Sequence, residues 1–223
     1  MRIRERADAV LAHPSAVLLA TQLVVVLAYP FLEGSVGGRA VLGVVQLGVV
    51  VAAVAAVRLT PALTWVAVLL GGPAMVLTVL EAWQPHSDPI VLASAAFHVP
   101  FYFYISFAML RYLFHDDRVT RDELFATGAA FTVVAWAFAY AYAACQVLWP
   151  GSFIGADGTG DRTWFELLFL SFTTLTSVGL SDVLPVEGHA RSFAMLEMIA
   201  GVFYVALVVA RLVSLAVVRH ERR

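Results

Sequence analysis

The stretch TLTSVGLSDVLP, from Thr174 to Pro185, is a short polar break containing a glycine, and strongly apolar segments lie on either side of it. Backbone outside a helix at membrane depth leaves amide and carbonyl groups unpaired, so it is tolerated only inside protein or along a water-filled cavity. A row of backbone carbonyl oxygens can replace the water around a passing monovalent cation. The residues from Ser177 to Ser181 therefore predict a pore or a substrate site inside a membrane.

The composition indicates that most of the chain lies in that membrane. Of the 223 residues, 61% are hydrophobic and 13% are charged, whereas soluble domains carry about 25% charged residues. The net charge of −2 argues against a nucleic-acid partner. All basic residues are arginines in a chain rich in alanine and valine, which indicates a prokaryotic genome of high GC content. The single cysteine, Cys145, rules out an intrachain disulfide and is expected to be a small buried residue.

Six segments are long and apolar enough to cross a membrane, because a helical span takes about 20 mostly apolar residues. These segments are roughly 14–31, 38–58, 62–81, 89–113, 123–148 and 190–217. A seventh apolar stretch, 164–176, is too short to cross and is typical of a re-entrant helix. The predicted fold is an all-α membrane protein with six transmembrane helices, a re-entrant helix and the polar loop that follows it.

The arginines predict a multi-pass protein of the plasma membrane with both termini in the cytoplasm. In this orientation the cytoplasmic arginines are Arg2, Arg4, Arg6, Arg58, Arg111, Arg118, Arg121, Arg211, Arg219, Arg222 and Arg223. The outer segments hold Arg39, Arg162 and Arg191. Because cytoplasmic loops are enriched in basic residues, this bias supports an even number of spans.

The polar break resembles the pore loop of tetrameric potassium channels, whose signature is T-T-V-G-Y-G-D followed by a nearby proline. The residues that match it identically or conservatively are Thr176, Ser177, Val178, Gly179 and Asp182. The last apolar segment is similar to the inner helix of small bacterial potassium channels. Gly201 lies 22 residues after Gly179, where that family has its hinge glycine. The resemblance covers roughly residues 123–218.

This resemblance implies a homotetramer in membrane lipid that conducts K⁺ passively through a filter lined by carbonyl groups. It implies a pore domain at 119–223 and leaves 1–118 as a four-helix accessory region. The filter residues, which would hold K⁺ ions as the only bound species, are Ser177, Val178, Gly179, Leu180 and Ser181. Residues expected to support the filter are Thr173, Thr174, Thr176, Asp182 and Glu197. No cofactor and no enzymatic activity are expected.

Two departures from the family pattern bear on selectivity. Leu180 stands in place of the tyrosine that ties the outer filter to the helix behind it, and Ser181 stands in place of the second glycine. If the backbone at Ser181 is left-handed, a residue other than glycine costs roughly 1–2 kcal/mol there. We therefore expect a reshaped outer filter. A weakly selective or Na⁺-permeable channel, or a non-conducting scaffold or sensor with a degenerate pore, remains an alternative.

Ionisable residues inside spans are costly and are therefore functional candidates. Glu197 is expected to accept a hydrogen bond from Thr173 or Thr174, or to be a protonated acid satisfied by another hydroxyl. Asp182 would attract cations at the outer mouth or serve as a helix cap. Glu166 is expected to complement the dipole at the start of the short helix.

His98 lies deep in the fourth span, two residues before Pro100. We expect a neutral histidine bonded to a backbone group that the proline frees, with a proton sensor as the alternative.

No span carries the series of basic residues that voltage sensing needs, since each charge contributes only about 2.3 kcal/mol per 100 mV. Gating is therefore expected in the filter or in the last helix, around Gly201. The residues after this glycine either form an apolar constriction that excludes water or only pack against other helices. They are Val205, Val208, Val209 and Leu212.

Overall fold

The computed structural model describes the chain except residues 1–13, 35, 58–61, 85–86, 115–120, 159 and 222–223, and it leaves out some side chains within the helices. In the described part, seven helices and two short strands form. The helices are α2 (Pro14–Leu32), α3 (Val36–Val57), α4 (Thr64–Trp83), α5 (Asp88–Leu113), α6 (Arg121–Leu148), α7 (Trp164–Leu175) and α8 (Gly188–Glu221). The strands are β1 (Phe153–Ile154) and β2 (Leu184–Pro185).

Among the described residues, five helices are long and apolar enough to cross a membrane, namely α2, α4, α5, α6 and α8. The helix α3 extends over 22 residues, and its described apolar part is Val44–Ala55. With 12 residues, α7 is too short to cross. The prediction of a mostly helical membrane protein is therefore confirmed, and the sixth span stays a prediction.

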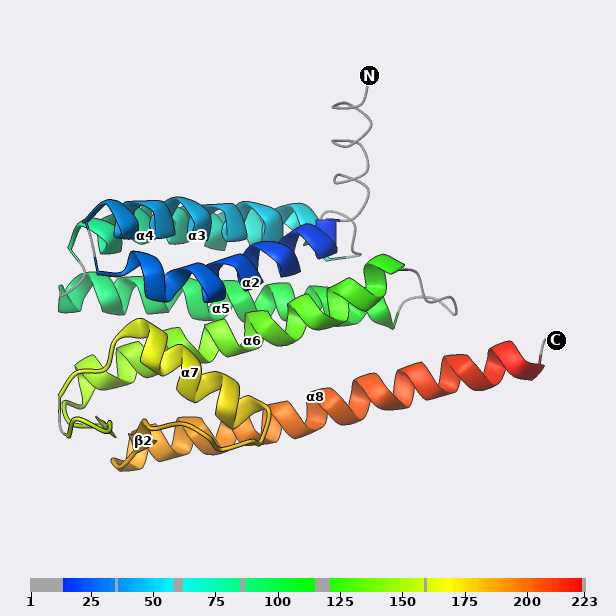
Figure 1. Ribbon diagram of the computed structural model, residues 1–223. Helices are drawn as coiled ribbons and strands as arrows, with labels where there is room; N and C mark the ends of the chain where they lie inside the picture. The colour runs from blue at the N-terminus through cyan, green and yellow to red at the C-terminus, as the bar shows by residue number, and fades with distance from the viewer. Residues whose placement is uncertain are drawn as a thin grey trace, which may run out of the picture.

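The helix α6 lies between the helices that precede it and α8 (Figure 1). Of its apolar segment, 67% is buried inside the protein, whereas the value for α8 is 28%. Alanines on α6, among them Ala126, Ala129, Ala130 and Ala137, are almost fully buried. Such small residues let helix backbones approach closely within a membrane, so α6 joins the first helices to the C-terminal part.

The helix α7 runs into the molecule beside α6 and α8, and the chain after it returns to the end from which α7 started (Figure 1). The two strands join the chain segments before and after α7. β1 pairs antiparallel with β2, with Phe153 opposite Pro185 and Ile154 opposite Leu184. Phe153 and Val183 are buried beside them. Residues 155–183 thus leave and rejoin the protein at nearly the same place.

Candidate functional site

The start of α7 is fixed by a capping box, a pair of reciprocal hydrogen bonds across the first turn. The Glu166 N–H donates to Thr163 Oγ1 at 3.3 Å, and the Thr163 N–H donates to Glu166 Oε2 at 2.6 Å. These bonds satisfy two amide groups that a helix start otherwise leaves unpaired. The carboxylate also faces the positive end of the helix dipole, as the sequence predicted for Glu166.

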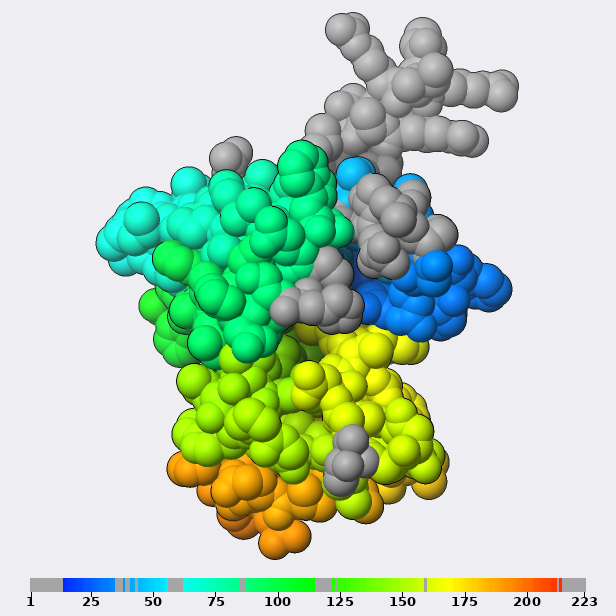
Figure 2. Space-filling view, turned by 90° about the vertical axis from the view of Figure 1, so that its left-hand side faces the viewer, coloured from blue at the N-terminus to red at the C-terminus, as the bar shows by residue number. Residues whose placement is uncertain are grey.

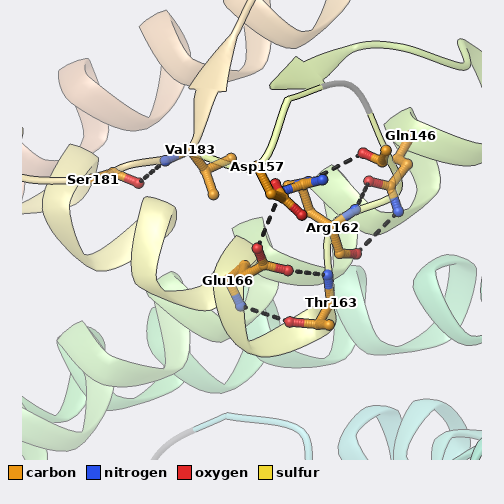
Figure 3. A network of polar contacts seen from close by, with 8 residues as sticks. Gln146, Asp157, Arg162, Thr163, Glu166, Ser181 and Val183 are labelled. Atoms are coloured by element: carbon orange, nitrogen blue, oxygen red, sulfur yellow. Dashed lines mark hydrogen bonds and ion pairs between the residues drawn. The ribbon is translucent and has the colours of Figure 1, made fainter. Parts of the chain in front are cut away.

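Arg162 joins the loop before α7 to the body of the protein (Figure 3). Its guanidinium group is buried, donates to Asp157 and lies 3.3 Å from Glu166 Oε1. Its backbone is held by the Gln146 side chain of α6, with the Arg162 N–H 2.7 Å from Oε1 and the Arg162 carbonyl 3.1 Å from Nε2. Hydrogen bonding to Arg162 holds the pKa of Asp157 below its ordinary value. From the sequence, Arg162 is only one of three arginines expected in the outer segments.

The end of α7 is a Schellman motif, a common way to terminate a helix. The Ser177 N–H donates to the Thr174 carbonyl at 3.0 Å, and the Val178 N–H donates to the Thr173 carbonyl at 3.0 Å. The Gly179 N–H also donates to the Thr173 carbonyl, at 3.1 Å. Ser177 has the left-handed conformation that this motif requires, with φ of 59°, where glycine is usual.

These hydrogen bonds determine where the neighbouring carbonyl groups point. In a trans peptide unit the N–H and the C=O lie on opposite sides of the C–N bond. Because three successive N–H groups after Thr176 turn back onto α7, the carbonyls of Thr176, Ser177 and Val178 point away from it. The side chain of Val178 is 58% exposed and that of Leu180 is 75% exposed. The result is a short row of carbonyl groups at a free surface of the chain.

The strain expected at Ser181 is absent, because its backbone is not left-handed. Among the described residues, the only non-glycine with positive φ is Ser177, and Gly179 follows with φ of 69°. Ser181 accepts a hydrogen bond at Oγ from the Val183 N–H at 3.0 Å, which shapes the returning chain (Figure 3). The departure from the family pattern therefore has a local role in this turn that glycine could not fill.

Glu197 connects three helices at the level of α7. It is fully buried, and its two carboxyl oxygens contact the hydroxyl groups of Ser171 on α7 and Tyr142 on α6. Ser171 Oγ also lies 2.8 Å from the Ala135 carbonyl. Glu197 therefore accepts hydrogen bonds from hydroxyl groups of two other helices, and whether it is itself protonated stays a prediction.

The expected partners of Glu197 were different residues of the same helix. The Thr173 hydroxyl donates to the Leu170 carbonyl of its own helix at 2.9 Å, so it is not available to α8. Thr176 behaves in the same way, donating to the Phe172 carbonyl at 2.6 Å. Glu197 therefore supports α7 through Ser171, one turn before the predicted threonines. Thr174 is buried, whereas Asp182 is exposed at the start of the return.

Gly201 lies where α8 crosses the end of α7. A Cβ atom at this position would be 2.0 Å from the Leu175 carbonyl oxygen. The observed role of the glycine is therefore to let the two backbones touch, and α8 is one continuous helix through it. A hinge at Gly201 stays a prediction.

The four residues predicted for a gate do not share one environment. Val208 is 8% exposed and packs in the core with α6 residues, so it belongs to helix packing. Val205 and Val209 are 51% and 53% exposed, on a face of α8 that no described part of the chain covers. The side chain of Leu212 lies outside the described residues. Two of the four predicted residues are thus exposed in the described structure.

His98 is buried in the first bundle, as expected for a histidine satisfied by its neighbours. Its Nδ1 lies 2.9 Å from the Ser94 carbonyl and its Nε2 lies 3.1 Å from Thr78 Oγ1. The ring stacks on Tyr140 at 4.2 Å. The carbonyl that Pro100 leaves unpaired belongs to Ala96, four residues before it, so the bonded group is not the one predicted. The ring instead turns back on the preceding turn of its own helix.

The comparisons with known proteins apply to this C-terminal half. Residues 127–218 match the family model described as an ion channel. Comparison of the chain with curated proteins and with solved structures finds no match. The matched range includes most of α6, all of α7, the carbonyl row and most of α8. Residues 127–218 of this chain are therefore similar to ion-channel domains.

Proposed function

We propose that the protein is a homotetrameric channel that conducts K⁺ passively across the plasma membrane. The observation that carries this proposal is the row of carbonyl groups from Thr176 to Val178, turned away from α7 at a free surface. In the proposed assembly, four copies of this row surround one path. The C-terminal end of α7 points its partial negative charge toward a cation there.

The expected depth of these carbonyl groups in the membrane supports the proposal. A helix of 12 residues is about 18 Å long, whereas the hydrocarbon layer is about 30 Å thick. A re-entrant α7 that starts near the outer surface therefore ends well inside the layer. Carbonyl groups at that depth cannot face lipid, so we infer that they face water and ions enclosed by further copies of the chain.

The uncovered face of α8 supports such an assembly. Its exposed apolar side chains are Met195, Leu196, Met198, Ile199, Val202, Phe203, Val205, Leu207 and Val209. In this arrangement, α8 of each copy lies along the path, residues 1–118 form an accessory region around it, and both termini are cytoplasmic. No voltage-sensing series of charges is part of the proposal.

A weakly selective cation channel is the second candidate, and one observation favours it. The hydrogen bonds turn three carbonyl groups away from α7, whereas the proposed K⁺ filter extends to Leu180 and Ser181. Fewer carbonyl sites in series would discriminate less between K⁺ and Na⁺. At Ser181 the chain makes a local hydrogen bond instead, from the Val183 N–H to the Ser181 Oγ.

Flux in reconstituted liposomes tests the proposal. Proteoliposomes with opposed K⁺ and Na⁺ gradients are expected to show K⁺ flux, and the permeability ratio separates the two candidates. Absence of flux for both ions would contradict each of them and favour a non-conducting scaffold.

A matched pair of variants ties flux to the carbonyl row. Gly179→Ala and Gly151→Ala both place a Cβ at a left-handed glycine, with φ of 69° and 82°, and neither Cβ meets another atom within 4 Å. The backbone strain is therefore similar, about 1–2 kcal/mol. Only Gly179→Ala is expected to reduce flux or alter selectivity, because Gly151 lies in the loop before β1. Equal flux in the two variants would mean that the backbone at Gly179 does not line the path.

A further inference from the structure

A cavity of about 760 Å³ lies among the accessory helices, α6 and the start of α7, away from the carbonyl row. Small-molecule sites usually have volumes of about 300–1,000 Å³, so this cavity is large enough for an organic ligand. Blue residues of α2 and yellow residues of α7 lie next to each other at this end of the molecule (Figure 2). The chemistry of its wall indicates what the ligand is.

Three aromatic rings form part of the wall. Trp164, the first residue of α7, lies 5.8 Å from the ring of Tyr29 and 5.7 Å from the ring of Tyr140, measured between centroids. All three residues line the cavity. The faces of aromatic rings attract organic cations, because each ring carries negative charge density on its faces.

A carboxylate without a cationic partner lies in the same wall. Glu81, in the last turn of α4, is half-buried and lines the cavity. It makes no ion pair with any residue of the described chain, and its hydrogen-bond partner is the Ser94 side chain. The nearby cation, Arg162, is already engaged by Asp157 and Glu166. Carboxylates withdrawn from water are normally paired, so Glu81 is the group of this wall that a cation in the cavity would pair with.

The hydroxyl group of Tyr140 adds a polar group to the cavity wall. The ring of Tyr140 is buried and stacks on His98. Its hydroxyl is not among the fully buried polar atoms of the described residues that lack a hydrogen-bond partner. Because Tyr140 lines the cavity together with Glu81 and Tyr29, this hydroxyl can exchange hydrogen bonds with water or a ligand there.

We propose that this cavity binds an organic ammonium cation between Glu81 and the rings of Tyr29, Tyr140 and Trp164. A metal ion fits the wall less well, because the described residues contain no group of three histidine, cysteine or acidic side chains that could hold one. A bound ligand would touch Trp164 and the capping residue Thr163 at the start of α7. Binding itself does not depend on the proposed ion conduction.

The test is isothermal titration of the purified full-length protein with two ammonium probes, choline and benzyltrimethylammonium. The matched control ligand is 3,3-dimethylbutan-1-ol, which has the shape of choline without the charge. We expect at least one probe to bind, and choline to bind about tenfold or more tightly than the neutral alcohol. Absence of binding for both ammonium probes, or equal affinity for choline and the alcohol, would overturn the proposal.

Three variants locate the site. Glu81→Gln keeps the size of the side chain and is expected to weaken ammonium binding about tenfold without changing binding of the alcohol. Glu187→Gln, which removes a carboxylate outside the cavity, is expected to leave both affinities unchanged. If Glu81→Gln does not fold, Tyr29→Leu removes one ring and is expected to weaken ammonium binding several-fold. If Glu81→Gln, or Tyr29→Leu in its place, folds and binds the ammonium probes with unchanged affinity, the proposal is overturned.

Discussion

At the scale of single residues, Ser177 has a backbone conformation that its side chain disfavours. Its φ of 59° belongs to the left-handed region, which costs a residue other than glycine roughly 1–2 kcal/mol. Glycine at the same site would avoid this strain and would lose about 0.5–1 kcal/mol through its more flexible unfolded chain. We therefore expect Ser177→Gly to stabilise the protein by up to about 1 kcal/mol, measured as a higher thermal melting temperature in detergent.

Ser181→Gly is the matched control for this prediction. The backbone of Ser181 is not left-handed, and its hydroxyl accepts a hydrogen bond from the Val183 N–H. The same serine-to-glycine change is therefore expected to lower the melting temperature here. If Ser181→Gly has a higher melting temperature than Ser177→Gly, the left-handed backbone strain does not lie at Ser177.

At the scale of the elements, the contact between α7 and α8 depends on Gly201. The Cβ of an alanine would lie 2.0 Å from the Leu175 carbonyl oxygen, so Gly201→Ala must push α8 away from the end of α7. Forcing an atom into a packed contact costs about 1–3 kcal/mol. We expect a lower melting temperature and, if the carbonyl row lines the path, altered ion flux in the same variant.

The control for Gly201 is a second glycine within a membrane-spanning helix. Gly72 on α4 is exposed, and a Cβ there meets no atom within 4 Å. Because alanine is a better helix former than glycine by up to about 1 kcal/mol, Gly72→Ala should leave stability unchanged or raise it. Equal losses in the two variants would contradict a role for close packing at Gly201.

The loop before α7 has a pH dependence that follows from the contact between Asp157 and Arg162. Since the pKa of Asp157 is lowered by this contact, its contribution to stability is present above the ordinary value of about 3.9. The contribution is lost as the pH falls through the lowered value in the folded state. We expect the melting temperature of the unmodified protein to fall more steeply below about pH 4 than that of Asp157→Asn.

Asp161→Asn provides the comparison for the acid measurement. Asp161 is an exposed carboxylate of the same loop, and in the described structure Arg162 donates to Asp157 and Glu166 instead. Asp161→Asn should therefore leave the fall of the melting temperature at acid pH as steep as in the unmodified protein. If Asp157→Asn behaves like Asp161→Asn, the contact with Arg162 does not stabilise the loop.

The sequence predicted the helices well because their apolar segments are nearly continuous and are separated by polar or glycine-containing turns. It also placed Glu197 beside the short helix, whereas it predicted Gly201 only as a hinge. It did not reveal the contacts of Glu197. Ser171, Tyr142 and Glu197 lie on three different helices, so no periodic spacing along one helix links them. Arg162 was missed for a related reason, because a buried loop arginine cannot be told from an exposed one by its position in the sequence.

At the scale of the whole molecule, the proposed path for ions requires several copies of the chain. Its carbonyl row and the apolar face of α8 are both exposed, and both lie within the matched range 127–218. The accessory helices pack on α6 and leave this surface free (Figure 1). Assembly and cation binding are therefore expected to be coupled, because a cation can bind several carbonyl rows only when the copies are together.

This coupling predicts that K⁺ stabilises the assembly. A ligand that binds only the assembled state stabilises it by RT ln(1 + [L]/Kd), about 2.7 kcal/mol for one site at 100 times Kd. The temperature at which the oligomer dissociates, measured by native electrophoresis after heating, should rise as K⁺ replaces a large organic cation that cannot enter a filter. A similar rise with Na⁺ would favour the weakly selective channel, because the same carbonyl groups would then hold either ion. A dissociation temperature that is independent of both ions would mean that the carbonyl rows do not meet, and that the copies, if they assemble, do so through another surface.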